Sequence, residues 1–425
     1  MAKHLTRRHL LGSLGAGALC TLGGLGGTAL ATSGVQGNKK LLYVYVHGAW
    51  DPVYTFDPKP DSPYVDDPSV DRPTDNPTDV ESVEQIQGHR VAINPFRRPA
   101  VAQFFEAWGH RTLSLVGVTI GGIAHYPNRL RILTGGTDRT RPDLVSILGH
   151  YSSVTEPFGA IDLSGWSFHG PHGATLSRVG FNWQLRNLLQ PGNVGIGEHL
   201  TADTREDDLV EAYLRRRALA RSHEAPLQRW PIDLSASIDR LEILRDHRAE
   251  LAQLFDRSPR NADDNLDLAV DLLAGGWARS VLVDTRYYFD THARNSDQSS
   301  LNNNLFGSLH RMLDRMESEG LLDDTLVLVT SEMTRSGRQN SGGGKDHWPL
   351  LANLLIGGGT VGGRTMGQTD ELLAPRPVDL HTGQLDPEGM VPRYDHFFAG
   401  LLTHLGIDAA EHMPGVTPLR GFDQA

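Results

Sequence analysis

Carboxylate and imidazole side chains stand at intervals along this 425-residue sequence, at positions that allow them to bind metal ions together. Aspartate, glutamate and histidine are the side chains that hold zinc, manganese and similar divalent ions in proteins. The candidate metal ligands are Asp51, Asp290, His292, Glu332, Asp346 and His347. His125 and Arg335 are further candidates for a part in the chemistry. The pattern predicts one or two divalent ions, with zinc, manganese and calcium all open, because mixed nitrogen and oxygen ligands suit several metals.

Each of these residues also has an ordinary structural explanation. An aspartate after a strand often caps a helix or shapes a turn; Asp51 precedes Pro52, and Asp290 precedes a predicted helix. A single histidine is more often a surface or hydrogen-bonded core residue than a ligand. Arg335 is equally compatible with a surface salt bridge. The metal hypothesis therefore depends on whether the fold brings these residues to one place.

Alternating strands and helices are predicted to position these side chains. Apolar runs predict strands at residues 41–46, 112–118, 278–284, 325–330 and 351–356. Helices are predicted at residues 99–108, 207–222, 235–255, 263–274, 299–319 and 395–405. The alternation indicates an α/β fold around a mostly parallel sheet, in which ligands bind beyond the carboxyl ends of the strands. Residues 57–90, crowded with Asp and Pro, are predicted as a long surface loop.

The N-terminus carries the features of a twin-arginine export signal. Arg7 and Arg8 stand just before an apolar run at residues 10–31, which ends in the small-residue pattern Ala29-Leu30-Ala31. We expect residues 1–31 to be a cleaved signal, the twin-arginine translocase to be a partner during export, and the mature protein to be periplasmic or secreted. The alternative is a membrane anchor, although its glycines make the run a poor membrane helix. Residues 32–425 are expected to form a single domain with a helical insertion around residues 205–260.

Composition restricts the partners further. The formal net charge of −11 argues against nucleic acid as a partner. The single cysteine, Cys20, lies within the predicted signal, so the mature chain must fold on a conventional core without disulfides. No run after Ala31 resembles a transmembrane segment, so we expect no stable membrane insertion after cleavage.

An ordered set of short motifs resembles one protein family. The blocks are Phe289-Asp290-Thr291-His292, residues 330–336 (TSEMTRS), Asp346-His347-Trp348 and the glycines at residues 357–359. Together they are similar to the twin-arginine-exported proteins known as domain of unknown function 1501 (DUF1501), across essentially the whole mature chain. The sequence departs from the family pattern at Asn295, where Gln is usual. It also carries Met, Thr and Ser at residues 333, 334 and 336, where the family has Phe, Gly and Thr.

That family resembles the alkaline phosphatase and sulfatase superfamily, which implies a three-layer α/β/α fold with metal ions at the carboxyl edge of a mostly parallel sheet. By this resemblance Asp51 and Glu332 would bind one metal, although Met333 falls where the superfamily has a histidine ligand. The residues that would bind the other metal are Asp290, His292 and His347, with Asp346 adjoining.

Residues 125–135 (HYPNRLRILTG) resemble the block of nucleotide pyrophosphatases that carries their nucleophilic threonine. His125 stands in place of that threonine, and Asn128 matches an asparagine that stabilises charge on the transferred group. A histidine can act as a nucleophile, a base or a metal ligand, and a purely hydrogen-bonding role is the alternative. Arg335 would neutralise an anionic substrate through its planar donor group.

The sequence thus predicts an exported, metal-dependent hydrolase of phosphate or sulfate esters, with an anionic ester as its substrate. A non-catalytic metal- or glycan-binding protein on a retired enzyme fold is the first alternative, because the usual nucleophile is missing. The second alternative is an enzyme that acts on a phosphonate or on a phosphoester-linked envelope polymer.

Overall fold

The computed structural model describes residues 39–71, 74–153, 155–179, 204–224, 230–256 and 261–423. The chain divides into two units, residues 1–34 and 35–425, and the described residues all belong to the second. The predicted export signal, with Arg7, Arg8 and Cys20, lies outside the described residues. Within the described ranges, no helix has the length and apolar character needed to cross a lipid bilayer.

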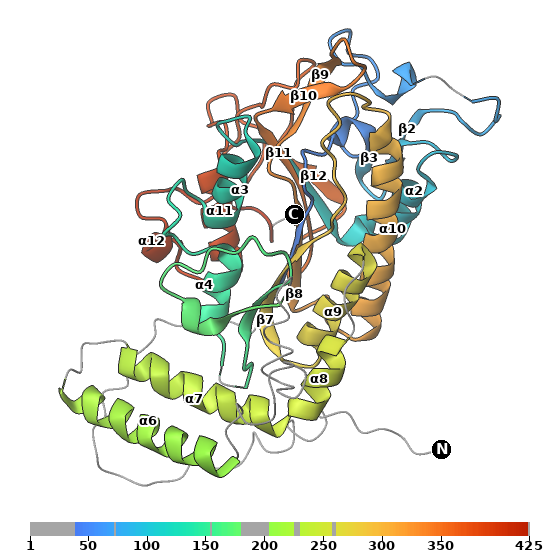
Figure 1. The fold of residues 1–425 in the computed structure, drawn as a ribbon. Coiled ribbons are helices and arrows are strands. Elements are labelled where there is room, and N and C mark those ends of the chain that lie inside the picture. Colours follow the sequence, from blue (N-terminus) through green and yellow to red (C-terminus); the bar gives the residue numbers. More distant parts are fainter. Residues whose placement is uncertain are drawn as a thin grey trace. The chain divides into compact units, whose positions relative to one another are not determined.

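An eight-stranded sheet lies at the centre of the described part of the second unit (Figure 1). In spatial order its strands are β12 (Arg364–Met366), β4 (Thr112–Thr119), β11 (Leu350–Gly357), β8 (Thr325–Thr330), β1 (Lys40–Tyr45), β7 (Ala278–Asp284), β5 (Gly159–Asp162) and β6 (Leu176–Arg178). β11 runs antiparallel to β4 and β8, and every other pair in this sheet is parallel. The mostly parallel sheet predicted from the sequence is therefore confirmed.

The central strand β1 shows why the sheet is covered on both faces. Its sequence, KLLYVY, is apolar along nearly its whole length, which is typical of a strand buried on both sides. Because side chains alternate along a strand, Leu42 and Val44 enter one hydrophobic core, whereas Leu41, Tyr43 and Tyr45 enter the other.

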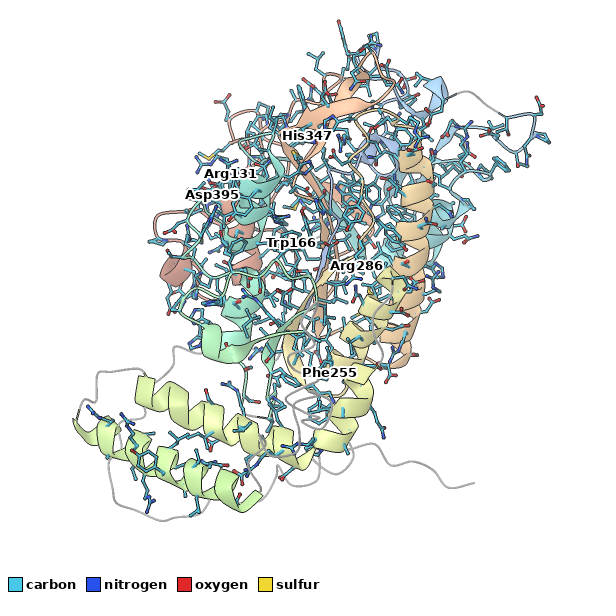
Figure 2. The ribbon with its side chains drawn as sticks, viewed as in Figure 1. Arg131, Trp166, Phe255, Arg286, His347 and Asp395 are labelled. Atoms are coloured by element: carbon cyan, nitrogen blue, oxygen red, sulfur yellow. The ribbon has the colours of Figure 1, made fainter. Side chains whose placement is uncertain are left out.

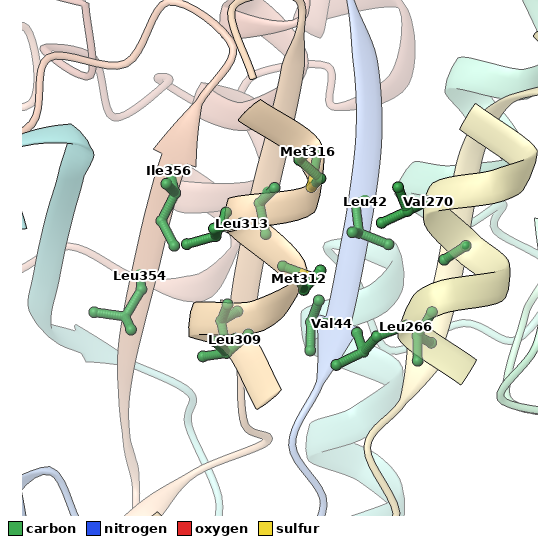
Figure 3. Close-up of a cluster of buried hydrophobic side chains, with 14 of the residues drawn as sticks. Leu42, Val44, Leu266, Val270, Leu309, Met312, Leu313, Met316, Leu354 and Ile356 are labelled. Carbon is green, nitrogen blue, oxygen red and sulfur yellow. The ribbon is translucent and has the colours of Figure 1, made fainter. Parts of the chain in front are cut away.

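Four helices cover the face of the sheet that carries Leu42 and Val44. They are α2 (Pro99–Trp108), α8 (Arg248–Asp256), α9 (Ala262–Ala274) and α10 (Asp297–Ser318). Figure 3 shows Leu266 and Val270 of α9 and the stripe Leu309, Met312, Leu313 and Met316 of α10 packed against this face. These residues recur at helical spacing, so each helix turns one apolar side toward the sheet.

The opposite face is covered by α3 (His125–Thr134), α4 (Leu144–His150), α11 (Tyr394–His404) and the short α12 (Ala409–His412). α3 ends at Gly135, whose φ of +64° is a left-handed conformation that favours glycine. With helices on both faces, the predicted three-layer α/β/α architecture is confirmed.

Three segments differ from the sequence prediction. The predicted helix at residues 235–255 is two helices, α7 (Trp230–Asp246) and α8, which follow α6 (Thr204–Glu224). The predicted loop at residues 57–90 is wrong at its end, where β2 (Ser82–Ile86) pairs with β3 (His89–Ile93). The segment after residue 333 contains the antiparallel pair β9 (Thr334–Gln339) and β10 (Lys345–Trp348), for which its polar sequence gave no apolar run.

Candidate metal centre

The carboxyl ends of parallel strands bring several polar loops together at one edge of the sheet. His47 comes two residues after β1, Asp290 lies in the loop after β7, and Glu332 comes two residues after β8. β4 has the same direction as β8 and leads into α3, which begins at His125. The β9–β10 pair supplies His347. This is the edge at which open α/β sheets bind ligands.

A glycine allows two of these loops to approach closely. Gly48 has a φ of +104°, and a Cβ atom there would lie 2.6 Å from the backbone nitrogen of Asp290. The Gly48 N–H also donates to Oε1 of Glu332 at 3.0 Å. Gly48 thus packs against the loop after β7 and also binds the Glu332 carboxylate through its N–H group. Its backbone conformation is one that suits glycine.

Three histidines and one aspartate direct their polar atoms toward one another. Ligand atoms of His125, Asp290 and His347 all lie within 4.8 Å of one another. Nε2 of His125 lies 3.5 Å from Oδ2 of Asp290, and Nε2 of His347 lies 3.2 Å from Oδ1 of Asp290. His292 adds an Nε2 atom 3.2 Å from the same Oδ1 and 3.0 Å from Nε2 of His347. We refer to His125, Asp290, His292 and His347 as the three-histidine site.

In each of these histidines the other ring nitrogen, Nδ1, is held by an oxygen atom. The pairs are His125 with Glu332 Oε1 (2.6 Å), His347 with the Ile123 carbonyl (2.7 Å) and His292 with Asp346 Oδ1 (3.3 Å). A carbonyl or carboxylate oxygen accepts, so the Nδ1 atom donates its proton. In the neutral rings the Nε2 atoms keep their lone pairs, which is how protein metal sites commonly orient histidine ligands.

Glu332 and His125 form a charge-assisted hydrogen bond. Glu332 is buried and accepts additional hydrogen bonds from the Gly48 N–H and the Ser331 hydroxyl. Burial raises the pKa of Glu332, but the hydrogen bond from His125 and other interactions outweigh it and leave the pKa below its usual value. The same hydrogen bond raises the pKa of His125. Glu332 is therefore ionised at neutral pH and fixes the orientation of the His125 ring.

Arg335 is predicted to face the substrate, and the structure corrects this. Its side chain is completely buried, and its guanidinium donates to Oδ1 of Asp290 at 2.7 Å. Its remaining acceptors are the backbone carbonyls of Gly48, Ala49, Phe289 and Lys345. Burial raises the pKa of Asp290, but the hydrogen bonds from Arg335 and His347 lower it to about 2 overall. Arg335 joins the loops after β1 and β7 to the start of β10 and keeps Asp290 ionised, so its donors are not available to a substrate.

Asp51, a predicted metal ligand, also has a different role. Its carboxylate accepts hydrogen bonds from Nζ of Lys345 at 2.8 Å and from Nδ2 of Asn295 at 2.9 Å. The side chains of Asp51 and Lys345 have no exposed surface, and the second carboxylate oxygen accepts from the Val53 N–H at 3.2 Å. Asp51 therefore forms a buried ion pair with Lys345 and lies outside the three-histidine site.

Asn128 is buried and does not face the three-histidine site with a free amide. Its Nδ2 donates to the Gly122 carbonyl at 2.8 Å, and its Oδ1 accepts from Nη1 of Arg131 at 2.8 Å. The amide therefore joins the loop before α3 to Arg131 of the helix, which corrects its predicted role. Met333, which replaces the superfamily histidine, is buried with Sδ 3.5 Å from Asn128 Nδ2.

Asp346 is exposed and lies beside the site, because it holds Nδ1 of His292 and accepts from Asn340 Nδ2 at 3.3 Å. The structure thus places Asp346 and Glu332 as the carboxylates that orient two histidines. Glu332 also retains its own potential as a ligand, since it belongs to the second group with His47 and His125 whose ligand atoms lie within 4.8 Å of one another.

His47 is the member of this second group that sequence reasoning missed. Its Nδ1 atom is buried and has no hydrogen-bond partner among the described residues. The signal was present in the sequence, because His47 follows the strand more directly than Asp51 does. A buried ring nitrogen without a partner, beside a carboxylate, matches the donor set of a second divalent ion.

A surface cavity of about 390 Å³ borders the three-histidine site at Asp290. Tyr288 and Arg294 contribute to its lining. Tyr288 is 63% exposed, and its ring centroid lies 5.4 Å from that of His47. A small molecule in this cavity would therefore contact both the carboxylate of the site and an aromatic surface.

Comparisons with known proteins match part of the chain to one family. Residues 232–409 match the model of the family described as "Protein of unknown function (DUF1501)". No curated protein matches the chain.

Several solved structures share a low similarity with the chain. A protein in the alkaline phosphatase superfamily from Vibrio parahaemolyticus is 10% identical, with a TM-score of 0.36 over 88% of this chain and 67% of that chain. The phosphonate monoester hydrolase of Agrobacterium radiobacter is 12% identical, with a TM-score of 0.34 over 91% and 77% of the two chains. The lipoteichoic acid synthase from Listeria monocytogenes is 8% identical, with a TM-score of 0.37 over 91% and 75%. These scores are too low to support any statement about activity.

The range matched by the family model contains three residues of the three-histidine site, Asp290, His292 and His347, together with Glu332. His125 and His47 precede this range. The chain matches the DUF1501 family across residues 232–409, which confirms the resemblance predicted from its motifs.

Proposed function

We propose that this protein is a metal-dependent hydrolase that acts on phosphate or sulfate esters. The observation that carries the proposal is the three-histidine site at the carboxyl edge of the sheet. Ligand atoms of His125, Asp290 and His347 lie within 4.8 Å of one another there, and His292 Nε2 adjoins Asp290 and His347. Three imidazoles and one carboxylate match the ligands of zinc and of similar first-row ions.

The spacing of two ring nitrogens supports a cation at this place. Nε2 of His292 and Nε2 of His347 lie 3.0 Å apart, and in both rings Nδ1 is the hydrogen-bond donor. Without an ion, a proton on His347 Nε2 allows its hydrogen bond to Asp290 at 3.2 Å. With both rings neutral and protonated at Nδ1, the two Nε2 lone pairs face each other, and a bound cation would share them. The residues present therefore fit a divalent ion.

Such an ion, when bound, would supply Lewis acidity to an ester and to water. The chain's own residues have separate tasks. Glu332 holds the His125 ring, Asp346 holds the His292 ring, and Arg335 fixes Asp290 through Oδ1. Fixed ligands of this kind lower the cost of organising the site when a substrate arrives.

One observation favours the alternative of a non-catalytic metal- or glycan-binding protein. His125 stands at the start of α3, where the resembling enzymes carry a threonine nucleophile, and its Nδ1 is engaged by Glu332 at 2.6 Å. A protein that binds metal but hydrolyses no phosphate or sulfate ester in a broad substrate panel would support this alternative over the hydrolase.

Elemental analysis of protein purified without chelator tests the metal. We expect one or two equivalents of zinc or manganese, lost in the double variant Asp290→Ala, His292→Ala. The matched control is His381→Ala, which removes an exposed histidine far along the chain and should leave the metal in place. Ester hydrolysis should disappear together with the metal. Protein that contains no metal, and gains neither metal nor activity when zinc or manganese is added, would contradict the proposal.

We also propose that the protein reaches the periplasm or the medium through the twin-arginine translocase. The support is the Arg7-Arg8 pair followed by the apolar run. Replacing both arginines by lysine should retain the full-length chain in the cytoplasm, as judged by cell fractionation. Unchanged export of that variant would argue against this route.

A further inference from the structure

A buried arginine without a partner lies next to the proposed metal centre. Arg129 of α3 is only 6% exposed. Its Nε atom is buried without a hydrogen-bond acceptor, whereas Nη1 and Nη2 are not among the buried unpartnered atoms. Within the described part of the chain, no hydrogen bond or ion pair joins this guanidinium to another residue. Its contacts are aromatic: the guanidinium carbon lies 3.6 Å from the ring centroid of Trp166 and 5.6 Å from that of Tyr126.

Two other buried arginines show how unusual this is. Arg335 donates to one carboxylate and four carbonyls. Arg98 also has a buried Nε without an acceptor, but its terminal nitrogens donate to the Glu81 carboxylate and the Ser299 hydroxyl. A buried Nε–H without an acceptor is unfavourable, and stacking on an aromatic ring compensates only part of that cost. The Arg129 guanidinium is therefore prepared for an anionic partner from outside the chain.

The position of Arg129 indicates which anion this is. Arg129 follows His125 by four residues on α3, so the two side chains lie on the same face of the helix. The Trp166 ring that supports Arg129 lies 6.3 Å from the His47 ring, which in turn lies 5.9 Å from the His125 ring. The guanidinium thus lies beside the metal-ligand groups.

Two features near Arg129 favour an anion: Trp166 is held by a hydrogen bond, and α3 begins without a side-chain cap. Nε1 of Trp166 donates to Oδ2 of Asp284 at 3.1 Å, which ties the loop after β5 to the end of β7 (Trp166 is labelled in Figure 2). α3 begins at His125 with no side-chain cap at Ala124. Pro127 has no N–H and the Asn128 N–H donates to the Ala124 carbonyl, so the His125 and Tyr126 N–H groups are the ones left for another acceptor. A fixed guanidinium next to an uncapped helix start is suited to an anion with several oxygens.

We propose that Arg129, stacked on Trp166, together with the N-terminus of α3, binds the tetrahedral oxyanion of the substrate, a phosphate or sulfate group. This inference rests on the proposed function and names the residue that recognises the anion. Arg129 takes the role that the sequence predicted for Arg335 and Asn128, whose polar atoms are used within the protein. The planar guanidinium donates two parallel hydrogen bonds to oxygens of such a group.

Calorimetric titration with inorganic phosphate and, separately, inorganic sulfate at constant ionic strength tests the proposal. Arg129→Gln should weaken binding of the preferred anion roughly tenfold or more, the loss typical of a hydrogen bond to a charged group. The matched control is Arg139→Gln, which removes an exposed guanidinium 4.7 Å from the Tyr126 ring and should change the affinity less than about twofold. The anion that binds more tightly, phosphate or sulfate, indicates which class of ester the protein recognises.

A second variant protects the test against misfolding. Arg129→Lys keeps the charge but loses the planar donor pair, so its affinity should lie between those of the original protein and Arg129→Gln. Circular dichroism and metal content establish that each variant is folded. The proposal would be overturned if both Arg129 variants bound the anion as tightly as the original protein. It would also be overturned if Arg139→Gln weakened anion binding as much as Arg129→Gln.

The experiment also separates this inference from the proposed function. The protein could contain metal that is lost in the Asp290→Ala, His292→Ala variant, while its anion affinity is the same with and without Arg129. That result would overturn the inference and leave the hydrolase proposal standing. Arg129-dependent binding of phosphate or sulfate by a protein that never takes up metal would support the anion site and contradict the hydrolase.

Discussion

Two aspartates that follow parallel strands have opposite fates in this protein. Asp290 faces the imidazoles of the three-histidine site, whereas Asp51 is buried against Lys345. The residue type and its position after a strand are the same in both cases. What differs is the partner, and Lys345 lies 294 residues away from Asp51 in the sequence. Local sequence therefore indicates which edge of the sheet a carboxylate reaches, but not which way its side chain points.

The Asp51–Lys345 pair leads to a prediction about stability. Asp51→Asn leaves the Lys345 ammonium buried without its counter-ion, and breaking a buried pair in this way costs about 3–5 kcal/mol. The free energy of unfolding, measured by urea denaturation, should fall by this amount while the metal content stays the same. Adding Lys345→Met to the variant should restore part of the stability.

The prediction would be contradicted if Asp51→Asn lost its metal but kept its stability. In that case Asp51 would be a ligand, as the family resemblance implies, and the ion pair would have little energetic weight.

At the scale of secondary structure, the sequence was sufficient where strands were long and apolar. β1, β4, β7, β8 and β11 lie within one or two residues of their predicted bounds, because apolar residues dominate each of them. β5 and β6 were not predicted, since they have four and three residues and little periodicity. The loop after β5 carries Trp166, so the surroundings of Arg129 were missed for the same reason.

The site shows the same division between what a sequence can and cannot give. Asp290, His292, Glu332 and His347 are predicted as ligands because short motifs place them after strands or in a distinctive block, and the structure brings them to one edge of the sheet. His125 is predicted from the resemblance of residues 125–135 to a block that carries a nucleophile. Arg129 has no hydrogen-bond acceptor because of how the surrounding segments fold around it. No pattern in the sequence predicts that arrangement.

The loop between β1 and the site gives a second prediction. Gly48→Ala should destabilise the protein by about 2 kcal/mol or more, because φ is +104° and the new Cβ would meet the Asp290 backbone nitrogen at 2.6 Å. The metal affinity should fall as well, since Asp290 must move. Gly276→Ala is the control: its φ is +70° and nothing lies within 4 Å of the new Cβ.

Thermal or urea denaturation and metal titration of both variants distinguish the two effects. The Gly276 variant should show the cost of the backbone conformation alone and keep its metal. Equal stability and equal metal affinity in the two variants would mean that the close approach at Gly48 does not shape the site.

At the scale of the whole molecule, the two cores make the sheet the element on which every other layer depends. Leu41 and Leu42 are neighbours in sequence, yet they belong to different cores. The helix α11, which covers one face, ends at His404, and this buried histidine links its end to Lys39 just before β1 through the His404 carbonyl at 2.8 Å. The protonation of His404 is therefore coupled to the folded state as a whole.

His404 gives the third prediction, the pH dependence of stability. Burial, with a contribution from Lys39, lowers the pKa of His404 to about 4, whereas an unfolded histidine has a pKa of about 6.5. Between these values only the unfolded chain takes up the proton, so stability is present above the unfolded pKa and is lost as the pH falls towards the folded pKa. From pH 7 to pH 5 the original protein should lose about 2 kcal/mol more unfolding free energy than His404→Leu. His110→Leu, at an exposed histidine, should behave like the original protein. Parallel pH profiles for the original protein and His404→Leu would show that the neutral, buried imidazole does not couple this end of α11 to folding.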